Sequence, residues 1–137
     1  MREAWRAAFG EGGGGVIRVL LVEGDQDRRT EMTRALDTVP GIDVVGQIGD
    51  GNVAASAVMA LNPDVVVMAA NLPTLSGPAA AELLAHSCPQ VRVLGLGGPG
   101  EGAALRAMQV AGAVGTVDPG AGTRELAGAI FDAVTCA

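Results

Sequence analysis

The sequence predicts a doubly wound α/β domain built on a five-stranded parallel sheet. Short apolar runs rich in valine alternate along the chain with longer segments in which apolar residues recur at helical spacing. Most of the short runs lack a polar residue at every second position, which is typical of strands that helices cover on both faces. The 137 residues suit one domain, and a hydrophobic content of 49% supplies its core.

The first half of the chain alternates strand, helix, strand and helix. The first run is apolar apart from Arg18, and the segment after it mixes charged and apolar residues at helical spacing. Pro40-Gly41 and Asn62-Pro63 are helix breakers that end the two helices. In chain order, the expected elements are the strand 16–22, the helix 26–38, the strand 42–48 and the alanine-rich helix 51–61.

The second half continues the same alternation. Pro78 suits the first turn of a helix, and Cys88-Pro89 ends that helix. The last helix carries its apolar residues on one face, and the last strand is short. In chain order, the expected elements are the strand 64–68, the helix 78–86, the strand 91–96, the helix 101–110, the strand 113–117 and the helix 124–135.

The chain is predicted to divide into a flexible N-terminal tail with a glycine linker, residues 1–15, and one folded domain, residues 16–137. Trp5 and Phe9 lie four residues apart and would share one face of a short helix. The tail is therefore either a docking segment or a frayed end.

Charge and composition exclude several classes of function. The net charge is −6, with nine arginines, no lysine and no tyrosine. An acidic balance argues against direct binding of DNA or an anionic membrane, and any mechanism that needs a lysine ammonium is excluded. No apolar run reaches the roughly 18 residues of a membrane span, and the first residues lack the apolar stretch of a signal peptide. Because Cys88 and Cys136 make no disulfide framework, we expect a cytoplasmic protein with reduced thiols.

Several separated segments resemble the CheY-like receiver domains of response regulators, and residues 40–51 are similar to the NarL/FixJ branch in particular. The resemblance covers roughly residues 16–135. It implies a flavodoxin-like (βα)₅ fold with the strand order 2-1-3-4-5. The similar segments are residues 17–23, 40–46, Asp50-Gly51, 62–68, Leu72-Pro73, Ser76-Gly77 and 111–115.

The resemblance implies a phosphorylation site that this sequence lacks. A receiver phosphorylates an aspartate after its third strand, and acidic residues after the first strand hold Mg²⁺. A hydroxyl after the fourth strand, an aromatic residue in the fifth and a lysine after the fifth complete the site. The matching residues here are Ala69 for the nucleophile, Glu23, Gly24 and Asp25 for the acidic group, Gly97 for the hydroxyl, Thr116 for the aromatic and Pro119 for the lysine. A non-phosphorylatable pseudo-receiver is therefore implied, and we expect no catalysis, metal ion or cofactor.

Small residues at the carboxyl ends of the strands allow a second interpretation. Ligands of doubly wound sheets bind at this edge, and shortened side chains leave a recess for an apolar or mixed ligand. The alternative is that nothing preserved these residues once phosphorylation was lost. The residues of this recess are Gly24, Ala69, Ala70, Gly97 and Gly98.

Residues 95–100 match the dinucleotide-binding pattern G-x-G-x-x-G, and Asp118 stands where a ribose-binding acid would. Glu101 places a negative charge at the start of the next helix, where a pyrophosphate needs positive potential. We therefore interpret this segment as a flexible glycine-rich loop. The three carboxylates within residues 23–27 are interpreted as solvated charge and helix capping rather than as a metal site.

The function expected from these residues is non-catalytic regulation of an attached or associated output, by self-association or by binding a partner or ligand. The NarL/FixJ resemblance implies a helix-turn-helix domain after Ala137 in a longer parent, so that DNA is contacted only through that domain. The alternatives are a small-molecule or nucleotide sensor and the atypical receiver of a CpaE-like localisation ATPase. We expect a homodimer without membrane contact, and its expected face includes Arg106, Gln109, Asp118 and Arg124.

Overall fold

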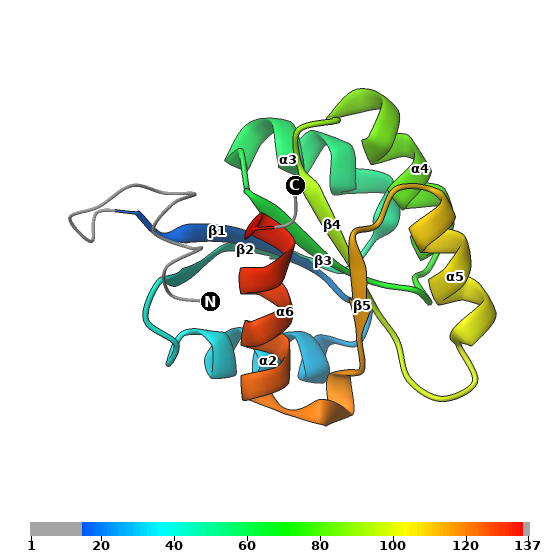
Figure 1. The fold of residues 1–137 in the computed structure, drawn as a ribbon. Coiled ribbons are helices and arrows are strands. Elements are labelled where there is room, and N and C mark those ends of the chain that lie inside the picture. Colours follow the sequence, from blue (N-terminus) through cyan, green and yellow to red (C-terminus); the bar gives the residue numbers. More distant parts are fainter. Residues whose placement is uncertain (1–14, 136–137) are drawn as a thin grey trace.

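The core of the protein is a five-stranded parallel sheet, seen in a computed structural model that describes residues 15–135 (Figure 1). The strand order is β2-β1-β3-β4-β5, so the predicted fold class and strand order are confirmed. The strands are β1 (Ile17–Val22), β2 (Ile42–Ile48), β3 (Val65–Ala69), β4 (Arg92–Leu96) and β5 (Gly115–Val117).

Helices cover both faces of this sheet (Figure 1). Two of them, α2 (Gln26–Leu36) and α6 (Thr123–Thr135), pack on one face. The opposite face carries α3 (Ala54–Leu61), α4 (Gly77–Ser87) and α5 (Gly102–Val110). Two short 3₁₀ turns, η1 (Gly51–Val53) and η2 (Pro119–Ala121), precede α3 and α6.

The core forms two apolar layers, because successive side chains of a strand point to opposite faces. In β3, Val65 and Val67 contact the layer under α2 and α6, whereas Val66 and Met68 contact the layer under α3, α4 and α5. All four side chains are fully buried. Burial of both faces explains why β3 is apolar throughout, as the sequence predicts.

The helix ends follow the expected chemistry. Asp25 caps α2, and Ser76 caps α4 with Pro78 in its first turn. Asn62 adopts a left-handed conformation with φ of 53° and ends α3. These local signals explain why most predicted boundaries lie within two residues of those observed.

Several boundaries differ from the sequence prediction by one to three residues, and the helix predicted over residues 26–38 ends at Leu36. The predicted helix 51–61 begins with the separate turn η1, and η2 was not predicted. The fifth strand starts at Gly115 rather than residue 113, because the amide of Ala113 donates to the carbonyl of Met108 at the end of α5. The third strand is displaced by one residue from the predicted range 64–68 and spans Val65–Ala69.

The predicted tail, including Trp5 and Phe9, and Cys136 lie outside the described residues, apart from Gly15. Those predictions therefore stay open. Within residues 15–135, Cys88 is a free and buried cysteine. None of the helices in that range is both long enough and apolar enough to cross a membrane.

Candidate functional site at the carboxyl edge of the sheet

The strand register brings most of the predicted site residues to one edge of the sheet. Val22 pairs with Met68, so Glu23 follows β1 at the level of Ala69. Ala69 pairs with Leu96, the last residue of β4, so Gly97 follows β4 at the same edge of the sheet. Parallel strands end at the same edge, and this is where doubly wound sheets bind their ligands.

Ala69 occupies the centre of this edge, as the last residue of β3. It is 5% exposed, and the following Ala70 is 4% exposed. The amide of Gly77 donates to the carbonyl of Ala70 at 3.0 Å, which holds the start of α4 against the end of the strand. The Ala69 methyl offers neither a nucleophilic oxygen nor a metal ligand.

Glu23 is a buried carboxylate whose two oxygens both have partners. Its side chain is 4% exposed, and Oε1 lies 3.2 Å from Nη1 of Arg28. The amide of Asp25 donates to Oε2 at 3.1 Å. A buried charge needs such compensation, and Glu23 obtains it within the chain.

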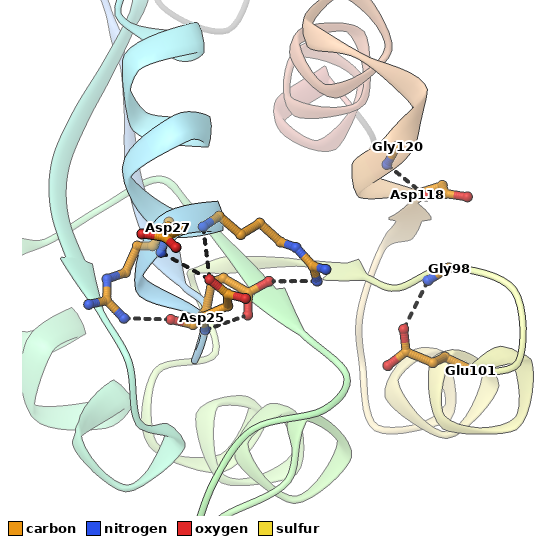
Figure 2. Close-up of polar contacts among 9 residues, drawn as sticks. Asp25, Asp27, Gly98, Glu101, Asp118 and Gly120 are labelled. Carbon is orange, nitrogen blue, oxygen red and sulfur yellow. Dashed lines mark hydrogen bonds and ion pairs between the residues drawn. The ribbon is translucent and has the colours of Figure 1, made fainter.

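Asp25 acts as the N-cap of α2, as the capping interpretation of the acidic cluster predicts. Its Oδ1 accepts hydrogen bonds from the amides of Asp27 at 2.9 Å and Arg28 at 3.1 Å (Figure 2). Across residues 15–135, no group of three or more His, Cys, Asp or Glu side chains is placed to hold a metal ion.

The loop from β4 to α5 contains the G-x-G-x-x-G pattern, and an internal carboxylate occupies it. The amide of Gly98 donates to Oε1 of Glu101 at 3.0 Å (Figure 2). Asp118, which stands where that pattern would have a ribose-binding acid, caps η2 by accepting from the amide of Gly120 at 2.8 Å. Both contacts favour the interpretation as a structural loop over a nucleotide site.

Neighbouring side chains take up part of the predicted ligand recess. A Cβ atom placed on Gly97 would lie 3.1 Å from Cδ2 of Leu105, and one on Gly24 would lie 3.1 Å from Cδ of Pro73. Leu105 and Pro73 thus cover two of the small residues. Gly98 has more space, because the atom nearest to an added Cβ would be Oδ1 of Asp118, at 3.7 Å. The ligand recess stays a prediction, and the side chains of Pro73 and Leu105 leave less room for a ligand than the small residues alone would.

The remaining predicted residues are exposed or half-exposed. Thr116 projects from β5, and Pro119 begins η2 beyond that strand. The four residues of the expected dimer face are all exposed, which leaves them accessible to a second copy of the chain. They come from α5, from the end of β5 and from the start of α6: Arg106, Gln109, Asp118 and Arg124.

The sequence prediction missed a contact between two loops at this edge. Oγ1 of Thr74, in the loop after β3, donates to Oδ1 of Asp50, in the loop after β2, at 2.5 Å. The same carboxylate oxygen accepts from the amide of Asn52 at 2.9 Å. Asp50-Gly51 could have been predicted to cap a turn, but nothing in the sequence indicates Thr74 as its partner.

The Thr74 hydroxyl and the Asn52 amide hold the pKa of Asp50 below its usual value of 3.8. A carboxyl group with a lowered pKa stabilises the fold above about pH 4, and this contribution is lost as the pH falls through the folded-state pKa. We expect Thr74→Val to raise the pKa of Asp50 toward 3.8, whereas Thr74→Ser keeps it low. A carboxyl-carbon NMR titration measures this, and Ser87→Ala, distant in the fold, is the control. Equal titration curves for Thr74→Val and the wild type would contradict the assignment.

The domain matches known receivers in sequence. The chain fits the response regulator receiver domain model over residues 19–131. It is 35% identical over 115 residues to the response regulator GacA of Pseudomonas viridiflava, which covers 84% of this chain and 54% of GacA. The chain therefore spans about half the length of such relatives.

Solved structures of receivers share this fold. The receiver domain of the putative response regulator NarL from Mycobacterium tuberculosis has a TM-score of 0.83 at 24% identity, covering 90% of this chain and 99% of that one. A LuxR-family two-component response regulator from Aurantimonas sp. has a TM-score of 0.79 at 29% identity, covering 88% of this chain and 86% of that one. The chain belongs to the response regulator receiver domain family of two-component signal transduction.

Proposed function

We propose that this domain is a receiver that regulates its output without aspartyl phosphorylation. The observation that carries the proposal is Ala69 at the end of β3, the position at which the resemblance to receivers implies a phosphoacceptor aspartate. Phosphoryl transfer to a receiver needs a carboxylate oxygen as the nucleophile, and a methyl group cannot replace it.

Other carboxylates near the edge are poorly suited to take over this role. Asp25 and Asp118 serve as caps of α2 and η2. Asp64 precedes β3 at the opposite edge of the sheet, where it accepts from the amide of Arg18 at 2.8 Å. Each of these oxygens already has a structural role away from the position of the family's nucleophile.

Two arginines near the edge, Arg28 and Arg29, contact Glu23. The chain contains no lysine, so no ammonium group can neutralise a transferring phosphoryl group. Arg28 pairs with the Glu23 carboxylate, and Arg29 donates to the Glu23 carbonyl at 2.7 Å. Both guanidinium groups therefore stabilise the loop after β1.

We further propose that the domain works in a longer transcriptional response regulator. The match to GacA over half of that protein's length, and the likeness to a LuxR-family regulator, support this assignment. DNA would then be contacted by an output domain, and this acidic domain would act through self-association or partner contact. The exposed residues of the expected dimer face are available for such pairing.

Incubation with acetyl phosphate and Mg²⁺ tests the proposal. We expect no species heavier by about 80 Da, the mass of one phosphoryl group, by intact-protein mass spectrometry. Light scattering on the same samples should give a dimer mass that the phosphodonor does not change. A receiver that carries the family aspartate is the positive control. A stoichiometric adduct on Asp25 or Asp118 would overturn the proposal, and a monomer at all concentrations would rule out self-association.

A further inference from the structure

The loop between β3 and α4, residues 70–76, contacts both neighbouring loops of the carboxyl edge. Pro73 packs on the backbone of Gly24 in the loop after β1. The carbonyl oxygen of Leu75 approaches Gly51 so closely that a Cβ there would lie 2.5 Å away. Leu72 is 8% exposed and anchors the loop in the core. Buried Leu72 and the contacts of Pro73 and Leu75 therefore hold the loop against the edge, although most of its other side chains are exposed.

Thr74 stands at the tip of this loop in an unfavourable conformation. Its φ of 61° lies in the left-handed region, which β-branched residues rarely adopt. Its hydroxyl oxygen lies 2.5 Å from Oδ1 of Asp50 and 2.6 Å from the carbonyl oxygen of Pro73. A hydroxyl has one proton to donate, and the carboxylate is the stronger acceptor. The bond to Asp50 thus offsets the cost of the conformation.

The loop between β4 and α5 is held by different contacts. Leu105 of α5 packs on the backbone of Gly97, with three of its carbon atoms 3.1 to 3.2 Å from the position of an added Cβ. Glu101 accepts from the amide of Gly98, and its own amide donates back to the carbonyl of Gly98 at 3.1 Å. At this position, where the resemblance implies a hydroxyl, the chain has a glycine, and the apolar side chain of Leu105 packs against it.

We propose that the carboxyl edge is fastened in one arrangement by the chain itself, through the Thr74–Asp50 hydrogen bond on one side of Ala69 and the packing of Leu105 on Gly97 on the other. Neither contact requires a phosphoryl group or a metal ion. This inference rests on the proposed function and adds its physical basis: the contacts that hold the carboxyl edge come from the chain's own side chains.

Amide hydrogen exchange tests the Thr74 contact. We expect residues 70–76 to exchange about tenfold faster in Thr74→Val than in the wild type, the scale of losing one hydrogen bond to a charged group. Thr74→Ser should restore slow exchange because it keeps the hydroxyl. Ser87→Ala, which removes a hydroxyl that donates to the carbonyl of Leu83 on the outside of α4, should leave residues 70–76 unchanged.

Leu105→Ala tests the second contact, and we expect faster exchange in residues 97–101. Addition of Mg²⁺ and acetyl phosphate to the wild type should change exchange in neither loop. Equal exchange in Thr74→Val and the wild type, or slower exchange when Mg²⁺ and acetyl phosphate are added, would overturn the inference. A phosphoryl adduct would contradict the proposed function. A change in the exchange of the wild-type loops on addition of Mg²⁺ and acetyl phosphate, without an adduct, would contradict only this inference about the edge.

Discussion

Replacement of Gly77 by alanine is expected to lower the free energy of unfolding by about 3 kcal/mol. Gly77 is the first residue of α4, and its added Cβ would lie 2.7 Å from Cα of Ala70 and 2.9 Å from the carbonyl oxygen of Ala70. These are backbone atoms at the end of a buried strand, so they cannot rotate away as a flexible side chain would. Either the start of α4 or the end of β3 must shift, and both are packed into the core.

Gly102→Ala is the matched control, because Gly102 is the first residue of α5 and has nothing within 4 Å of an added Cβ. Its substitution should change stability by less than about 0.5 kcal/mol or raise it slightly, since alanine favours a helix. Urea unfolding followed by circular dichroism at 25 °C measures both variants. Equal destabilisation by the two substitutions would show that the close approach at Gly77 is not the cause.

Leu84→Ala should produce a loss of similar size, about 3 kcal/mol, because it removes a fully buried side chain from the layer under α3, α4 and α5. The adjacent Leu83 is 42% exposed on the same helix. Leu83→Ala removes the same atoms from the same helix, and we expect it to lower the free energy of unfolding by less than about 1 kcal/mol.

The comparison of the two leucine variants isolates burial, since residue type, helix and helix propensity are shared. The free energy of unfolding from urea titrations, with the denaturant slope checked for constancy, provides the measurement. A loss at Leu83 as large as at Leu84 would place the core boundary of α4 elsewhere than the structure does.

The fold could be predicted from the sequence because its signals are local or periodic. The apolar residues of β3 alternate between two covered faces, and Asn62 before Pro63 ends α3 as predicted, whereas α2 already ends at Leu36, before Pro40-Gly41. Short turns escaped prediction, because η1 and η2 depend on one capping aspartate each, Asp50 and Asp118. Such single-residue signals compete with the longer pattern of the following helix.

The candidate site could be predicted only in part. The positions of Ala69 and Gly97 at the carboxyl edge follow from where their strands end. The contact of Thr74 with Asp50 joins residues 24 positions apart in two loops without periodicity. The packing of Leu105 on Gly97 depends on how α5 lies against β4, which helical spacing does not specify. Contacts made by loops across a sheet edge require the three-dimensional arrangement.

The hydrogen bond from Gly98 to Glu101 makes the glycine-rich loop behave as if it were already ligated. The carboxylate is attached three residues from the amide that it accepts from, so this contact is intramolecular and has an effective concentration on the order of millimolar without any dissolved anion. A free phosphate or nucleotide would have to displace the Glu101 carboxylate and bind in spite of the repulsion between the two negative charges. The Glu101 side chain thus competes, within the chain itself, with any anion for the amide of this glycine-rich loop.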